Sequence, residues 1–306
     1  MKVLLYEYRW CDENPEINTS IQTKFQASSG SRYGEKKISV GEPISIEICS
    51  EVRCAGSRRD NEWRPCPNNV MGRKKCESCR AREGQFVFTS FDGFNTENLT
   101  ADDLARIDGS HFVYLALFEK SLVKVGVSKA ERQELRQIEQ GSHATLFIAQ
   151  TPNGILARQI ETTIRKSGLA DKIQSGQKKN FLLPEISLSE SEVVLREVLE
   201  KHILALDSFP DLKPHLLEAP LFQGWDAFYQ IEGVRDRSDK SLINLKLALS
   251  ESVSGTLVAR KGSFVVIETP EEFISINAKD LVGKEIEFDH KSPGIVLNQA
   301  IQNSLF

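Results

Sequence analysis

Cysteines are the residues of this chain whose spacing most clearly predicts chemistry. Cys76 and Cys79 form a C-x-x-C pair, and this short spacing directs two thiolates at one metal ion. Cys54 and Cys66 can supply a second pair, and Cys49 lies nearby as an alternative ligand. Four thiolates leave zinc no open position for water, so we predict a structural zinc site rather than a catalytic one. The alternative is a set of small, buried thiols without metal.

The cysteine-rich segment is also rich in arginine and lysine, although the whole chain has a net charge of −4. A metal-held loop that displays cations can bind phosphates, and an indole ring can stack on a base. We therefore predict a nucleic-acid interface formed by Arg58, Arg59, Trp63, Lys74 and Lys75. In the alternative interpretation, these cations belong to a solvated face that offsets the charge of the thiolates.

Length and composition predict an ordinary globular protein. The chain has 306 residues, 40% hydrophobic and 27% charged, which suggests about two or three domains. No segment reaches the roughly 18 consecutive apolar residues that a membrane span needs, and the N-terminus lacks the features of a signal peptide. We therefore expect a cytoplasmic protein with no membrane partner, where clustered cysteines hold metal more often than they form disulfides.

Hydrophobic periodicity divides the chain into three expected domains of an α+β protein, the first of which spans residues 1–99. Short alternating strands lie between Lys37 and Ile48, and residues 49–84 then show neither a helix period nor a strand period. A loop of this length needs an organising centre, which the cysteines can provide. The sequence therefore predicts an N-terminal β domain with a zinc loop.

The second expected domain, residues 100–185, has the pattern of a β-hairpin, a helix, a third strand and a second helix. Thr100 and Asp103 resemble a helix N-cap with its capping partner, and Gly141 can end the first long helix. The expected elements are strands at 111–118, 122–127 and 144–149, and helices at 128–140 and 155–166.

The third expected domain, residues 186–306, begins with an amphipathic helix after Ser187. Three prolines, Pro210, Pro214 and Pro220, then break the chain into turns. Short strands separated by glycine-rich corners predict a small C-terminal β-sheet or barrel. These strands are expected at 245–249, 253–258, 263–267 and 285–288.

Two short motifs stand out in the second domain. They are Phe112-Val113-Tyr114 in the first strand and Lys124-Val125-Gly126 in the second, followed by an arginine-bearing helix, a third strand and a helix that carries Glu161. This order of motifs resembles that of the GIY-YIG nuclease superfamily. The resemblance covers roughly residues 110–182. It implies a central three-stranded antiparallel sheet with helices, in which Gly126 allows close packing.

The resemblance also implies roles in phosphodiester hydrolysis. Tyr114 would lie beside the nucleophile, Arg132 or Arg136 would neutralise the phosphate, and Glu161 would bind magnesium or manganese. Lys124 stands where the superfamily has its second motif tyrosine, and it would contact phosphate. In the alternative interpretation, Tyr114 belongs to the core, the two arginines form surface ion pairs and Glu161 is solvated.

A closer resemblance is to an uncharacterised prokaryotic family of unknown function that joins such a domain to an upstream cysteine cluster. The stretches that resemble its signature are Val113–Ala116, Lys124–Ser128 and Arg136–Gly141. The resemblance to this family extends upstream through the cysteines, so it covers more of the chain than the nuclease motifs do.

Together these features predict a nucleic-acid-binding protein, and the nuclease resemblance implies a divalent-metal-dependent endonuclease. One alternative is a catalytically inactive adaptor on the same scaffold that binds nucleic acid or protein. A third alternative is a protein-binding module, because apolar residues cluster near Leu216, Leu217, Leu221, Phe222, Trp225, Phe228 and Tyr229. The sequence does not distinguish DNA from RNA, and it does not indicate the oligomeric state.

Overall fold

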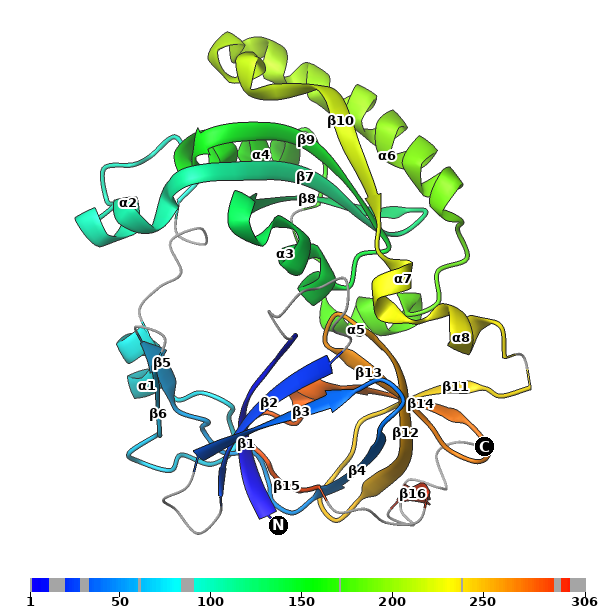
Figure 1. Ribbon diagram of the computed structural model, residues 1–306. Helices are drawn as coiled ribbons and strands as arrows, with labels where there is room; N and C mark the ends of the chain where they lie inside the picture. The colour runs from blue at the N-terminus through cyan, green and yellow to red at the C-terminus, as the bar shows by residue number, and fades with distance from the viewer. Residues whose placement is uncertain are drawn as a thin grey trace. The chain divides into compact units, whose positions relative to one another are not determined.

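The chain forms two compact units in the computed structural model (Figure 1). Unit 1 combines Met1–Gly84 with Phe228–Phe306, and unit 2 comprises Gln85–Ala227. Both units contain strands and helices, which confirms the α+β class. The structure describes residues 2–10, 20–27, 33–59, 62–83, 91–170, 172–237, 239–288 and 293–297.

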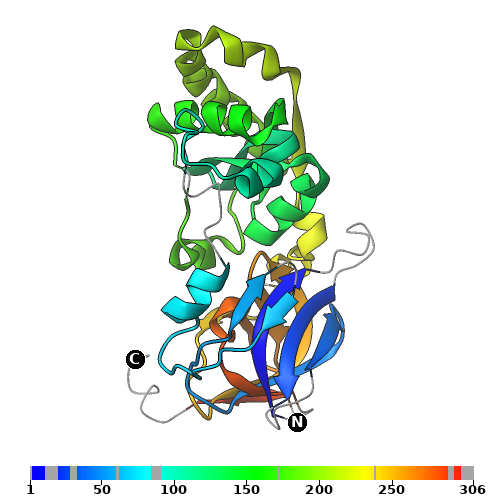
Figure 2. The same cartoon turned by 90° about the vertical axis from the view of Figure 1, so that its left-hand side faces the viewer.

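Unit 1 is built on a ten-stranded sheet to which both ends of the chain contribute. Its order is β11-β14-β13-β12-β4-β15-β1-β2-β3, with β16 paired to β12, and β11 with β14 is the one parallel strand pair that the described part of this sheet contains. Figure 2 shows these strands curving around a common interior. The strands are β1 (Lys2–Trp10), β2 (Ser20–Ala27), β3 (Tyr33–Ser39), β4 (Pro43–Ile48), β11 (Leu242–Leu245), β12 (Ser252–Lys261), β13 (Phe264–Glu268), β14 (Phe273–Asn277), β15 (Glu285–Glu287) and β16 (Gly294–Val296).

The core of unit 1 comes from alternating apolar residues on one face of this sheet. Ile44, Ile46 and Ile48 along β4 belong to the same buried cluster as Val253 and Leu257 of β12. Since β4 pairs with both β12 and β15, strands from the two ends of the chain share one core. A short helix, α8 (Glu232–Arg235), and a 3-10 turn, η6 (Ala278–Asp280), complete the regular structure beside this sheet.

The two units differ from the domains 1–99, 100–185 and 186–306 expected from the sequence. The N-terminal and C-terminal β segments lie in one sheet instead of two separate domains. Helix α6 (Leu188–Ile203), expected to open the C-terminal domain, packs on the sheet of unit 2. Pairing between strands that are distant in the chain leaves no trace in local periodicity, which explains the difference.

One strand of unit 1 is shifted from its expected place. The sequence pattern predicts a strand at 245–249, whereas β11 ends at Leu245. Its partner β14 ends at Asn277, where the Asn277 side chain accepts a hydrogen bond from Lys279 N and the chain turns into η6. Residues after Leu245 therefore have no β14 backbone to pair with, and that part of the prediction is wrong.

Residues 49–83, which we call the cysteine loop, form an excursion from the sheet of unit 1. The loop contains a hairpin of β5 (Ser57–Arg59) and β6 (Glu62–Arg64) and the helix α1 (Glu77–Glu83). Arg53 anchors it, because its N–H donates to Gly283 O at 2.7 Å and its guanidinium pairs with Glu285 at 2.8 Å. Gly283 has a φ of 86°, and an added Cβ would lie 2.4 Å from Arg53 O, so only glycine permits this approach.

Unit 2 contains a four-stranded antiparallel sheet of order β10-β9-β7-β8. The predicted hairpin and third strand are confirmed as β7, β8 and β9, and the two predicted helices as α3 and α4. The elements are α2 (Ala101–Ile107), β7 (Asp108–Glu119), β8 (Leu122–Lys129), η2 (Ala130–Arg132), α3 (Gln133–Gln140), β9 (Ala144–Asn153), α4 (Gly154–Lys166), α5 (Ser175–Lys178), η3 (Lys179–Phe181), α6, η4 (Leu204–Ser208), η5 (Pro210–His215) and β10 (Leu216–Gly224); α7 (Asp226–Tyr229) then leads into unit 1.

Strand β10 is a fourth strand that the sequence analysis interpreted as proline-broken turns. Its pairing with β9 shifts register between Leu216 and Leu221, and Pro220 lies inside that irregular stretch. Proline is tolerated there because β10 is an edge strand, where one side of the backbone needs no ladder partner.

The two faces of β7 have different surroundings, because successive side chains of a strand point to opposite faces. Val113 and Leu115 face the main core of unit 2, together with Ala157 and Ile160 of α4. Tyr114 therefore points to the other face, where its register partner across the hairpin is Gly126 of β8.

The helix ends follow the predicted signals. Thr100 and Asp103 form a complete capping box at α2, and Gly141 ends α3 with a left-handed φ of 73°. Asn153 accepts a hydrogen bond from Leu156 N at 3.0 Å and so caps α4.

The contact between Tyr114 and Gly126 gives a first test of the fold. A Cβ added at Gly126 would lie 2.5 Å from the Tyr114 hydroxyl oxygen, so Gly126→Ala should lower the free energy of unfolding by about 1–3 kcal/mol. Gly176→Ala is the matched control, because nothing lies within 4 Å of its added Cβ. Denaturant titration of both variants measures the difference, and equal stabilities would contradict the packing described here.

Candidate functional site

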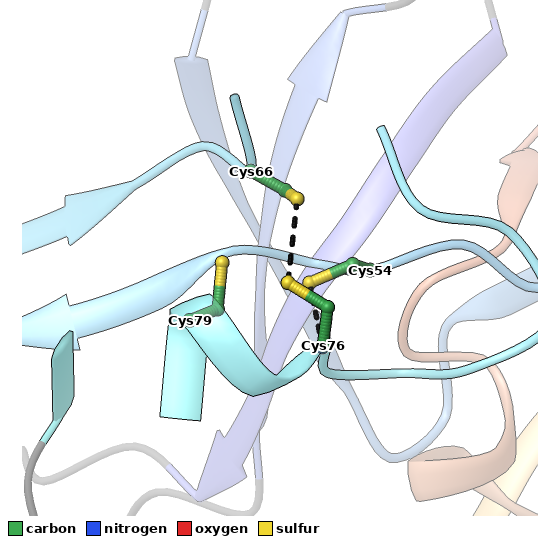
Figure 3. A group of neighbouring side chains, drawn as sticks. All are labelled: Cys54, Cys66, Cys76 and Cys79. Carbon is green, nitrogen blue, oxygen red and sulfur yellow. Dashed lines mark hydrogen bonds between the residues drawn. The ribbon is translucent and has the colours of Figure 1, made fainter. Parts of the chain in front are cut away.

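The cysteine loop brings four predicted ligands together. The sulfur atoms of Cys54, Cys66, Cys76 and Cys79 all lie within 4.8 Å of one another. Figure 3 shows the four side chains gathered around one point. Tetrahedral zinc, with Zn–S bonds of about 2.3 Å, separates its sulfurs by about 3.8 Å. The Cys66 and Cys76 sulfurs are 3.8 Å apart. The group therefore fits one tetrahedral ion, and these four cysteines can bind a metal such as zinc.

The surroundings of the sulfurs also suit a metal–thiolate group. Cys54, Cys76 and Cys79 are buried, and the Cys76 N–H donates to the Cys54 sulfur at 3.2 Å. Burial raises the pKa of Cys54, and burial and the neighbouring thiols raise the pKa of Cys79. At Cys66 burial acts in the same direction, but hydrogen bonds from backbone N–H groups outweigh it and lower the pKa to about 6. A divalent cation would hold all four as thiolates and remove this competition for protons.

Cys49 lies outside the group of four, which resolves the choice of ligands left open by the sequence. Its thiol is directed at Glu47 O, at 3.7 Å, and burial raises its pKa. Cys11 lies outside the described residues. The C-x-x-C pair and the two preceding cysteines therefore form the candidate metal centre.

Trp63 and Arg58, both predicted to contact nucleic acid, have structural partners instead. The Trp63 indole stacks on Tyr6 with ring centroids 4.0 Å apart, and its Nε1 donates to Ala55 O at 2.6 Å. Arg58 forms an ion pair with Glu7 of β1. Both side chains therefore attach the cysteine loop to the sheet of unit 1, and the indole face that stacks on Tyr6 is not open to a base.

The two predicted lysines are also engaged. Lys74 pairs with Asp280 at 2.9 Å, and Lys75 pairs with Glu83 of α1. The side chain of Arg59 lies outside the described part of the structure. These lysines therefore hold the turn before Cys76 in place.

Three arginines that were not among the predicted contacts are exposed cations of the cysteine loop, beside the exposed Arg64 and Lys74, which have carboxylate partners. Arg73 lies on the turn before Cys76, and Arg80 and Arg82 lie on α1. All three side chains are exposed and form no ion pair within the described residues. Sequence could have pointed to them only through their proximity to the ligands Cys76 and Cys79.

In unit 2, Tyr114 is buried beneath α3. Its side chain is 1% exposed, and its hydroxyl oxygen accepts a hydrogen bond from Gln140 Nε2 at 2.7 Å. Burial raises the pKa of the Tyr114 phenol. Arg136 and the two glutamines of α3, Gln140 and Gln137, act in the opposite direction, whereas the charge of Glu161 raises the pKa further.

The other residues predicted from the nuclease motifs lie in different environments. Arg132 is exposed and pairs with Glu139 at 3.0 Å, so Arg136 is the arginine whose charge acts on the Tyr114 phenol. Lys124 is buried in β8, two residues before Gly126 and on the same face. Glu161 is not solvated at the margin of α4: it is buried, 6% exposed, and its carboxylate pairs with Arg158.

The charges of Arg136 and Glu161 therefore both act on the Tyr114 phenol. The phenol is covered, with Gln140 of α3 in contact with its hydroxyl, and the Glu161 carboxylate already has a cation beside it.

The apolar cluster considered as a protein-binding surface is divided by the fold. Trp225 and Tyr229 are fully buried, and Trp225 Nε1 donates to Thr145 at 2.8 Å. Leu221 on the edge strand β10 is 56% exposed. The largest side chains of this cluster thus belong to the interior.

The chain was compared with known families and proteins. Residues 41–286 match the family described as Protein of unknown function (DUF2797). The chain belongs to this family. No curated protein and no solved structure matches it. Within the described residues, no helix has the length and apolar character needed to cross a membrane.

Because the four cysteines form one candidate metal centre, we predict one zinc ion per chain in purified protein. Replacing Cys76 and Cys79 together by serine should remove the ion and lower the melting temperature of unit 1, because the loop has few other buried groups. Elemental analysis and thermal unfolding measure both effects. Cys49→Ser is the control and should keep full zinc content, whereas metal-free wild-type protein of unchanged stability would sink the assignment.

Proposed function

We propose that this protein binds nucleic acid and that unit 2 is a metal-dependent endonuclease domain of the GIY-YIG type. The observation that carries the proposal is the set of charges acting on one phenol: Arg136 from α3 and Glu161 from α4 both affect the pKa of Tyr114. A phenol, a guanidinium and a carboxylate are the groups that such hydrolysis uses. The register of Tyr114 against Gly126 and the order of β8, β7 and β9 agree with the resemblance.

Each group has a role that its chemistry supports. Tyr114 would hydrogen-bond the attacking water, and Arg136 would neutralise charge on the phosphate. Lys124, on the same face of β8 as Gly126, would supply a second cation where the superfamily has a tyrosine. Glu161 would hold magnesium or manganese, which commonly bind through one or two carboxylates together with substrate phosphates. The buried carboxylate of Glu161 would fit that pattern, with Arg158 as the cation already beside it.

A second candidate is a nucleic-acid-binding adaptor without catalysis. Two observations favour it: the Tyr114 hydroxyl is covered, and Glu161 is neutralised by Arg158. In such an adaptor, unit 2 would serve only as a rigid scaffold. The two candidates differ in cleavage and share the expectation that nucleic acid binds.

Binding of phosphates is assigned to the exposed arginines of the cysteine loop, Arg73, Arg80 and Arg82. Their side chains are exposed and form no ion pair within the described residues. A phosphate can therefore pair with these arginines without breaking an ion pair of the protein. The predicted residues Arg58, Lys74 and Lys75 would each have to leave a carboxylate first. This contrast makes Arg73, Arg80 and Arg82 the better candidates.

Cleavage tests the nuclease assignment directly. Glu161→Gln should lower kcat at least about 100-fold with magnesium or manganese while binding of the same oligonucleotide stays unchanged, because the substitution removes charge but little volume. Glu134→Gln on the exposed side of α3 is the control and should cleave like wild type. Cleavage by Glu161→Gln at the wild-type rate would defeat the role of Glu161, and tight binding without any cleavage by wild type would support the adaptor.

Salt dependence tests the binding surface. Replacing Arg73, Arg80 and Arg82 by glutamine should weaken binding of a single- or double-stranded oligonucleotide and reduce the slope of log K against log salt by about 0.7–0.9 per lost phosphate contact. Replacing Arg58, Lys74 and Lys75 should instead lower stability and leave that slope unchanged. Fluorescence anisotropy at several salt concentrations separates the two sets, and a slope unaffected by the arginine variant would rule this surface out.

A further inference from the structure

We infer that Gln140 is a positioning residue for Tyr114: its side-chain amide holds the phenol oxygen as a hydrogen-bond acceptor, so that the phenol proton is left for another partner. A catalytic role for Gln140 rests on the proposed function, whereas its position beside the phenol follows from the hydrogen bond between α3 and β7. Gln140 is not among the residues that the nuclease resemblance selects.

The orientation of the Gln140 amide is fixed by a second contact. Its Nε2 donates to Tyr114 Oη at 2.7 Å and to Arg136 O at 3.1 Å. A backbone carbonyl can only accept, so the group that faces it must be the NH₂ and not the amide oxygen. The same NH₂ faces Tyr114, and the phenol oxygen is therefore the acceptor in that bond.

The position of Gln140 is fixed by its own backbone as well. Gly141, in the left-handed conformation, ends α3 directly after it. The carbonyl of Gln140 accepts a hydrogen bond from Lys178 Nζ at 2.6 Å, and that ammonium also lies 4.7 Å from the centre of the Phe118 ring. A side chain held at both its amide and its carbonyl has little freedom to turn away from the phenol.

The sheet limits the position of the Tyr114 phenol on the side opposite α3. Tyr114 lies against Gly126, and its ring meets Phe147 edge-on at 6.3 Å. The hydroxyl therefore cannot shift away from α3 without losing that packing. An amide donor at a fixed place favours the phenolate form of Tyr114 and directs the proton of the neutral form away from Gln140, which are the properties of a phenol that assists an attacking water.

The sheet-facing side of α3 supplies a matched control. Gln133, Gln137 and Gln140 follow one another at i, i+4 and i+7, so they share one face of the helix. Gln137 accepts a hydrogen bond from Thr145 at 3.3 Å and also lowers the pKa of the Tyr114 phenol, so it does not serve as a control. Gln133 has the same residue type on the same face, and no hydrogen bond joins it to the phenol. Comparing Gln133 with Gln140 therefore separates the contact with Tyr114 from the general effect of a glutamine on this face.

The experiment is a titration of the phenol in the full chain. A ring-fluorinated tyrosine, whose pKa lies nearer neutrality, is incorporated at position 114, and its ¹⁹F resonance is followed against pH. Gln140→Met, which keeps length and helix propensity but has no donor, should raise the midpoint by about one pH unit. Gln140→Glu should raise it further, because a negative charge beside the phenol also opposes phenolate. Gln133→Met should leave it unchanged.

Equal midpoints in Gln140→Met and Gln133→Met would overturn the inference. If Gln140→Met fails to fold, Gln140→Glu decides, and a midpoint equal to that of the parent protein would again overturn it. The titration uses no nucleic acid, so it is independent of cleavage. Where cleavage is found, the pH–rate profile of Gln140→Met should move upward by the same amount. If the midpoints move as expected but no cleavage is found, Gln140 is still the residue that positions the Tyr114 phenol, and the nuclease proposal is wrong.

Discussion

Four sulfur atoms form the interior of the cysteine loop, and the arrangement of that part of unit 1 depends on them. The buried cluster in this segment consists of Cys54, Cys76 and Cys79, with Cys66 and Val70 packed against it. A loop with so little apolar surface cannot offset the conformational entropy of its ordering by hydrophobic burial. Bonds to a metal ion would supply the missing free energy, since a site that forms only in the folded state contributes its binding free energy to folding.

The charged residues around this centre divide into two groups by what they contact. Arg53, Arg58 and Lys74 pair with carboxylates of the sheet or of the turn before β15, and so fix the loop to its base. Because a carboxylate already neutralises the charge of each of these cations, they would attract an external phosphate only weakly. The free charge of the loop lies instead on the helix and turn that carry Cys76 and Cys79. The metal centre would thus set the position of the surface we assign to phosphate binding.

In unit 2 the corresponding constraint is the close contact of a tyrosine ring with a glycine across the hairpin. Gly126 provides the space in which the Tyr114 ring lies, and Phe147 and Gln140 limit the other directions. The phenol is positioned by packing, but it is also covered.

Local sequence determined the hairpin, third strand and two helices of unit 2, its helix caps and the C-x-x-C pair of the candidate metal centre, because turn residues, apolar periodicity and the C-x-x-C spacing act over a few residues. The tertiary structure alone decided the rest. Pairing of β4 with β12 and β15 joined two segments expected to be separate, since strand pairing depends on contacts distant in the chain. Burial of Tyr114, and the effect of the Arg136 charge on its phenol, depend on where α3 lies. Whether Trp63 or Lys74 is free depends on partners contributed by β1 and by the turn after β14, which no pattern within the cysteine loop encodes.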